Sequence, residues 1–260
     1  MKNIISYFCS MKMHQFLDAT YLKSSAQAGI TEAENLEIVK SLTNEAIANN
    51  YKLLMIRAKY IPKVKQLLRI ANAPTLIGTV IGFHEGTSTV AKKLTEAETA
   101  IHLGADELDF VLNYNAFKEG NFQLIDQEII ACTKYCLEKQ KVIKWIIETA
   151  ALTNEEIVVI SQRIREIVLK HFTIASAKNV FVKSSTGFYK TANHIPNGAT
   201  LENMRLIIAH AKPLKVKAAG GVKTLEMAKK MIALGVDRIG TSSAKEIVKN
   251  EINSNKIDQY

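Results

Sequence analysis

The feature that most constrains the fold is an alternation of short, apolar, β-rich runs with amphipathic helical stretches along the whole chain. One such stretch places Leu36, Val39, Thr43, Ala46 and Ile47 at the spacing of a single helix face. Capping-box spacing at Thr31 and Thr153 and glycines at 104 and 235 mark helix starts and ends. The runs predicted as strands cover residues 14–18, 52–57, 75–80, 107–112, 142–148, 179–184, 215–219 and 237–241.

Eight strand–helix units in 260 residues predict an α/β protein of the (β/α)8 type, a TIM barrel. The main alternative is an open, doubly wound sheet. Such a sheet often carries a Gly-x-Gly-x-x-Gly turn after its first strand, and the sequence has none. We therefore expect residues 1–260 to form one barrel domain, with a helical N-terminal extension over residues 1–12 and a mobile polar tail over residues 250–260.

The charge balance favours an anionic partner. The chain has 34 basic and 25 acidic residues, a formal net charge of +9. The lysines are spread along the chain without an arginine-rich or basic-aromatic cluster, which indicates a small anionic substrate rather than nucleic acid. No stretch approaches the length of a membrane span. Cys9, Cys132 and Cys136 lack zinc-like spacing and are typical of structural thiols in a reducing cytoplasm, where we expect the protein to work.

Ionisable residues lie at or near the ends of five predicted strands. They are Asp18, Asp109, Glu148, Lys183 and Lys217. Active sites of such barrels form at the carboxyl ends of the strands, and charged groups in apolar runs are costly unless paired. A desolvated lysine beside a second cation has a lowered pKa and can form a Schiff base with a carbonyl. The alternative for each residue is a structural salt bridge.

Two glycine-bearing loops predict a phosphate site. Gly220 and Gly221 follow the seventh strand, and residues 240–243, with Ser242 and Ser243, follow the eighth and lead into a short helix. Barrels commonly bind phosphate at these two loops, through backbone amides and a helix N-terminus. Ordinary tight turns are the alternative.

Six segments taken together resemble the deoxyribose-phosphate aldolase family, class I aldolases on a (β/α)8 barrel. They are residues 16–18, 104–109, 146–149, 181–187, 217–221 and 240–243, in order along nearly the whole chain. The resemblance implies reversible cleavage of 2-deoxy-D-ribose 5-phosphate to acetaldehyde and D-glyceraldehyde 3-phosphate, in deoxyribonucleotide catabolism. It implies a lysine Schiff base without metal or cofactor, and a homodimer is one option for the assembly.

The resemblance also implies roles for single residues. Lys183 matches the Schiff-base lysine, while Lys217 and Asp109 match residues held to assist proton transfer, with Lys217 lowering the pKa of Lys183. Asp18 is expected either to orient a substrate hydroxyl or to hold Lys217. Glu148 is expected to take one of these two roles or to form a purely structural ion pair.

The phosphate-binding positions of the family match Gly187, Gly220, Gly221, Ser242 and Ser243. Some departures concern this end of the site: Phe188 stands where some members have a lysine, and Lys223 replaces an arginine. Met55 stands where many relatives have a cysteine. Some relatives have a C-terminal tyrosine that reaches the site, which makes Tyr260 a candidate for the same role; a terminal residue without a function is the alternative.

Two functional alternatives stay open. Another class I lyase or a transaldolase would use Lys183 in the same covalent role with a different donor carbonyl. A non-catalytic barrel would bind a sugar phosphate or nucleic acid through its positive charge.

Overall fold

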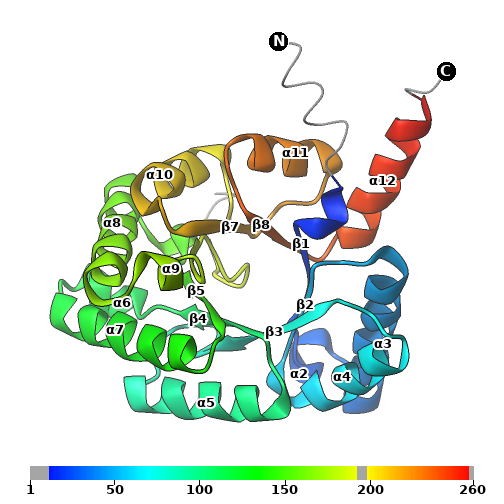
Figure 1. The fold of residues 1–260 in the computed structure, drawn as a ribbon, viewed down its shortest axis with the longest axis horizontal. Helices are drawn as coiled ribbons and strands as arrows, with labels where there is room; N and C mark the ends of the chain where they lie inside the picture. The colour runs from blue at the N-terminus through cyan, green and yellow to red at the C-terminus, as the bar shows by residue number, and fades with distance from the viewer. Residues whose placement is uncertain (1–11, 192–197, 258–260) are drawn as a thin grey trace.

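Eight parallel strands form a closed barrel, and helices surround it on the outside (Figure 1). The computed structural model of the chain describes the backbone of residues 12–191 and 198–257. Each strand pairs with the next along the chain, and β8 pairs with β1 to close the sheet. The predicted (β/α)8 fold is confirmed.

The strands are β1 Leu17–Tyr21, β2 Leu53–Ile56, β3 Leu76–Ile81, β4 Glu107–Val111, β5 Val142–Ile146, β6 Val180–Lys183, β7 Lys215–Ala219 and β8 Arg238–Thr241. The helices are α2 Ser25–Ala28, α3 Glu32–Asn49, α4 Ile61–Ile70, α5 Val90–Leu103, α6 Tyr114–Lys118, α7 Phe122–Glu138, α8 Asn154–His171, α9 Ile174–Ala177, α10 Leu201–Ala211, α11 Leu225–Ala233 and α12 Ala244–Ile257. Short 3-10 helices cover η1 Met13–Gln15, η2 Ala58–Tyr60 and η3 Thr149–Ala151.

Local signals in the sequence set the helix ends. Thr31 and Thr153 form the two predicted capping boxes, each accepting a hydrogen bond from the N–H of a glutamate three residues later. Gly104 ends α5 in the left-handed conformation at φ 110°, which glycine adopts without strain. These helix ends are therefore encoded nearby in the chain.

The two faces of the sheet have different characters. Outward-facing side chains such as Phe110 and Trp145 are fully buried beneath the helices, in the main apolar core. Inside the barrel, β2 and β3 contribute apolar residues, including Leu53, Met55 and Val80. The inner face of β4 to β8 instead carries charged residues, and this asymmetry determines where the site lies.

The ends of the chain differ from the sequence-based expectations. The first strand begins at Leu17 rather than His14, because residues Met13–Gln15 form a 3-10 helix. Asp18 is consequently the second residue of β1, not its last. Residues 250–257, part of the expected tail, continue helix α12, which extends away from the barrel (Figure 1), and their mobility stays a prediction. Residues 1–11 and Tyr260 lie outside the described residues.

A buried ion pair between α5 and α7 fixes the loop after β3. Lys93 of α5 is fully buried, donates hydrogen bonds to the carbonyls of Gly86 and Val111 at 2.7 Å each, and pairs with Glu128 of α7. Burial raises the pKa of Glu128, and Lys93 opposes that change. The pair therefore joins two helices and a loop through one desolvated cation.

Replacing Lys93 with methionine should lower the free energy of unfolding by about 3–5 kcal/mol, because Glu128 loses its buried counterion. Urea denaturation would measure this change. The double variant Lys93→Met with Glu128→Leu should recover a large part of the loss, since it removes both charges. Equal instability of the single and double variants would contradict this account.

None of the helices in the described part of the chain is long and apolar enough to cross a lipid bilayer.

Candidate active site

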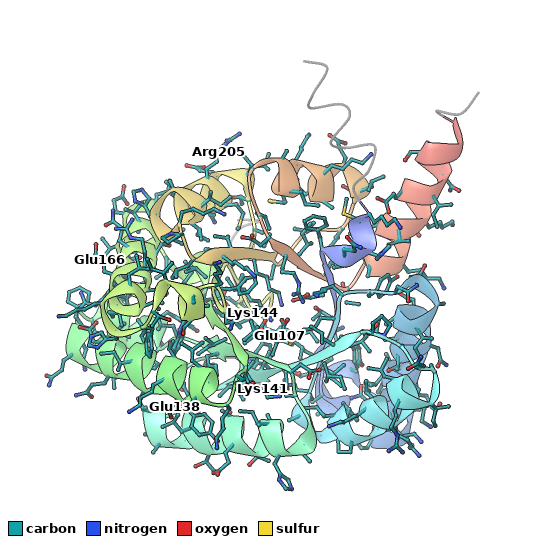
Figure 2. The ribbon with its side chains drawn as sticks, in the orientation of Figure 1. Glu107, Glu138, Lys141, Lys144, Glu166 and Arg205 are labelled. Carbon is teal, nitrogen blue, oxygen red and sulfur yellow. The ribbon has the colours of Figure 1, made fainter. Side chains whose placement is uncertain are left out.

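Seven charged side chains form a buried network inside the barrel. They come from β1 and from the five strands β4 to β8. Figure 2 shows two of them, Glu107 and Lys144, inside the ring of strands, whereas Glu138, Glu166 and Arg205 lie on the outside. Each member exposes no more than 6% of its surface. The members are Asp18, Glu107, Asp109, Lys144, Lys183, Lys217 and Arg238.

Asp109 lies at the centre of this network. Its Oδ2 accepts hydrogen bonds from Nζ of Lys183 and Nζ of Lys217, each at 2.8 Å, and its Oδ1 accepts one from Lys144 at 2.8 Å. Burial by itself would raise the pKa of Asp109, but the charges of Lys144, Lys183 and Lys217 outweigh burial and hold that pKa well below its usual range. Asp109 is therefore a carboxylate shared by three amines.

The structure brings Lys183 and Lys217 together. They are paired positions of β6 and β7, and their amines share the same oxygen of Asp109. Burial is the main cause that lowers the pKa of Lys183, to about 8; Asp109 opposes this effect, while the charges of Lys217 and Lys144 add to it. An appreciable fraction of Lys183 is thus an uncharged amine near neutral pH.

Lys217 is held in place from two sides. Its Nζ lies 2.6 Å from Oδ2 of Asp18 and 2.8 Å from Oδ2 of Asp109. Its stem passes over Gly240 of β8, where an added Cβ would come within 3.0 Å of the Lys217 Cε. A glycine at position 240 therefore leaves room for this lysine.

The lower part of the network was missed by sequence reasoning. Glu107 lies 2.5 Å from Lys144 and 3.2 Å from Arg238, whose Nε also donates to Asp18 at 2.7 Å. Burial opposes ionisation of Asp18, but Arg238 first, and then Lys217 and Lys144, lower its pKa to about 2. Two signals were available: Glu107 lies two residues before Asp109 and so shares its strand face, and Lys144 interrupts an apolar run.

Glu148 lies apart from the network. It follows the end of β5 in a left-handed conformation, φ 58°, and is fully buried. Its carboxylate accepts hydrogen bonds from the Ser185 hydroxyl at 2.6 Å, from the Thr186 N–H at 3.1 Å and from the Thr186 hydroxyl. Glu148 thus fixes the loop after β6, directly beyond Lys183.

Replacing Glu148 with glutamine should lower the free energy of unfolding by about 1–3 kcal/mol, because an amide cannot accept all the hydrogen bonds that the carboxylate accepts. Thermal denaturation would measure the loss. The exposed Glu138, changed to glutamine in the same way, is the matched control and should differ from wild type by no more than about 0.5 kcal/mol. Equal stability of the two variants would show that Glu148 does not fix the loop.

A cavity of about 280 Å³ opens above the network, at the carboxyl ends of the strands. Lys183 lines this cavity, whereas Lys217, Asp109 and Asp18 do not. Of the two paired lysines, Lys183 is therefore the one whose amine meets an incoming molecule. Loops after β1, β6, β7 and β8 form the remaining walls.

Four of the five predicted phosphate-binding residues line the same cavity: Gly187, Gly220, Gly221 and Ser242. The three glycines have φ values of 77°, 89° and 84°, which non-glycine residues rarely adopt. Ser243 is not part of the lining, and its N–H donates to the hydroxyl of Thr241 at 2.9 Å.

Comparisons with known proteins agree with this geometry. The family model described as DeoC/LacD family aldolase matches residues 16–249. A curated relative from Mesoplasma florum, named deoxyribose-phosphate aldolase 1, is 37% identical over 246 residues, which cover 94% of this chain and 99% of the relative. Deoxyribose-phosphate aldolase from Mycoplasmoides pirum is 34% identical over 245 residues, covering 94% and 100% of the two chains.

Solved structures give the same result. The aldolase QR15 superposes with a TM-score of 0.76 at 31% identity, over 95% of this chain and 99% of that one. Deoxyribose phosphate aldolase from Aeropyrum pernix, at 24% identity, shares the fold with a TM-score of 0.74 over 93% and 92% of the two chains. The chain therefore belongs to the DeoC/LacD aldolase family.

Proposed function

We propose that the protein is a deoxyribose-phosphate aldolase, which reversibly cleaves 2-deoxy-D-ribose 5-phosphate to acetaldehyde and D-glyceraldehyde 3-phosphate. The observation that carries this proposal is the placement of Lys183. It is a buried amine with a lowered pKa, it lines the cavity, and it shares a carboxylate with Lys217. The names of the related proteins support the choice of substrate.

The reaction begins when the neutral amine of Lys183 attacks the aldehyde carbon of the open-chain sugar, and loss of water gives an iminium ion. The iminium accepts the electron pair of the breaking carbon–carbon bond, while a base removes the proton of the adjacent hydroxyl. D-glyceraldehyde 3-phosphate leaves and an enamine remains. Protonation of the enamine carbon and addition of water then release acetaldehyde and restore Lys183.

Asp109 and Lys217 are our candidates for the proton transfers. Asp109 accepts hydrogen bonds from the amines of both Lys183 and Lys217, so a proton can pass along these contacts. Asp18 is paired with Lys217 and Arg238 and does not line the cavity, which favours its role in holding Lys217. Glu148 acts as a positioning residue for the loop after β6.

Borohydride trapping tests this function. The protein is treated with acetaldehyde and borohydride, digested, and mapped by mass spectrometry. We expect a reduced adduct on Lys183 with acetaldehyde and none with dihydroxyacetone phosphate, which would distinguish this enzyme from a transaldolase or another class I lyase. An adduct on Lys217, or no adduct, would contradict the proposal.

We propose that the enzyme acts in the cytoplasm, in the breakdown of deoxyribonucleotides. The buried, unpaired thiols of Cys132 and Cys136 are compatible with a reducing compartment. Assembly as a homodimer stays a prediction, which analytical ultracentrifugation of the full chain would test.

A further inference from the structure

Six of the seven side chains in the buried network form a closed ring in which bases and acids alternate. Each base of this ring bridges two acids, and each acid in turn bridges two bases. In ring order the members are Asp18, Lys217, Asp109, Lys144, Glu107 and Arg238, which again contacts Asp18. Three carboxylates therefore balance three cations, and we refer to these six residues as the charge ring.

Glu107 and Arg238 belong to the charge ring but lie away from the cavity. Each is the first residue of its strand, β4 and β8, and neither lines the cavity at the carboxyl ends of the strands. Glu107 lies 2.5 Å from Lys144 and 3.2 Å from Arg238. Nε of Arg238 donates to Asp18 at 2.7 Å. Among the described side chains, no hydrogen bond or ion pair joins Glu107 or Arg238 to Lys183.

Lys183 is attached to the charge ring at a single point. Within residues 12–191 and 198–257, Asp109 is the one carboxylate that its amine contacts, at 2.8 Å. Glu148, the nearest buried acid along the next loop, directs its carboxylate to the backbone and hydroxyls after β6. The other ionisable side chains that line the cavity are partly or fully exposed: Tyr21, Lys23 and Lys223. A proton on Lys183 therefore adds a buried charge that the balanced ring does not cancel.

We propose that Glu107 and Arg238 are positioning residues that set the charge state of Lys183 through the ring, without touching it. The inference rests on the proposed function only for the use of that amine as the nucleophile. Buried charges are weakly screened, so the loss of one ring charge acts on the other members and on the attached amine. Removal of an acid leaves surplus positive charge, which favours the neutral amine, whereas removal of a base favours the ammonium form.

The test compares Glu107→Gln, Arg238→Met and the double variant that carries both changes. Glu138→Gln and Arg205→Met are the matched controls, because they make the same charge changes at exposed positions outside the barrel (Figure 2). Acetic anhydride labels neutral amines, so the rate at which Lys183 is acetylated from pH 6 to 10, followed by peptide mass spectrometry, gives its midpoint without any turnover. Thermal denaturation verifies that each variant is folded.

We expect Glu107→Gln to lower the midpoint of Lys183 by about half a pKa unit and Arg238→Met to raise it by a similar amount. Each change alters the fraction of neutral amine at pH 7 roughly threefold, in opposite directions. The double variant loses one charge of each sign and should return the midpoint to that of wild type, as should both controls. Either single variant decides by the sign of its shift, so the test survives if the other does not fold.

Unchanged midpoints, or shifts of both single variants in the same direction, would overturn the proposal. A purely structural role would loosen the barrel most in the double variant, which would then differ most from wild type. Acetaldehyde trapping on the same proteins keeps the two proposals separate. Opposite midpoint shifts without any acetaldehyde adduct would support the charge ring and refute the proposed function alone, whereas an adduct on Lys183 with unchanged midpoints would do the reverse.

Discussion

Changing Lys183 to arginine should lower kcat for cleavage of 2-deoxyribose 5-phosphate by about four orders of magnitude or more, as for loss of other covalent nucleophiles. Arginine keeps the positive charge and can still pair with Asp109, but its guanidinium remains protonated and forms no Schiff base. The measurements are steady-state cleavage rates and borohydride trapping with acetaldehyde, in which the adduct on residue 183 should disappear.

The control for this variant is Lys178→Arg, which makes the same change at an exposed lysine just before β6. It should keep the activity of wild type. Turnover that survives in the Lys183→Arg enzyme would mean that the reaction does not pass through this amine. Absence of turnover in the wild-type protein is the separate result that would favour a binding protein without catalysis.

Changing Lys217 to methionine should move the pH dependence of Schiff-base formation to higher pH. In wild type, the trapping rate should rise as pH increases through about 8, because Lys183 must lose its proton before it can attack. Without the charge of Lys217, Asp109 stabilises the protonated form of Lys183 more strongly. The pKa of Lys183 should therefore rise by about one unit or more. Each unit lowers the fraction of neutral amine at pH 7 about tenfold.

The trapping rate of this variant, measured from pH 6 to 10, checks the shift. The protein should remain folded, because Asp109 keeps Lys144 and Asp18 keeps Arg238 as counterions. The loss of kcat should exceed the loss explained by pKa alone if Lys217 also transfers protons. An unchanged midpoint would show that burial, and not Lys217, sets the pKa of Lys183.

The repeating pattern made most of the fold predictable. Apolar runs of strand length alternate with segments that have the spacing of an amphipathic helix. Few folds can bury eight such apolar strands, and the (β/α)8 barrel is one of them. The end of β1 was misplaced because a charged residue, Asp18, was interpreted as the last residue of the strand, whereas β1 continues to Tyr21. Inside this barrel a carboxylate can lie within the strand, since Arg238 and Lys217 from other strands neutralise it. That compensation comes from residues about two hundred positions away in the sequence.

The candidate site was predictable only where the chemistry lies at strand ends. Lys183 and Lys217 stand out because each ends an apolar run before a glycine-bearing turn. Glu107, Lys144 and Arg238 lie deeper, and their importance depends on the register that sets Lys144 beside Asp109 and Arg238 beside Lys217. Register is a property of the closed sheet as a whole. Glu148 is different: it lies beyond the end of β5 in a left-handed conformation, and its carboxylate therefore contacts the loop after β6 rather than the network.

Lys183 and Lys217 are paired across β6 and β7. The reactivity of the amines therefore depends on the strands, whereas the choice of substrate depends on the loops. Backbone hydrogen bonds of the sheet set the spacing of the two amines, while loops of independent sequence surround the incoming molecule. Insertions or exchanges in those loops can therefore alter which aldehydes enter and leave the proposed nucleophile, Lys183, in place. In protein engineering, the substrate range of this barrel could therefore be changed one loop at a time, while the two paired lysines stay in position.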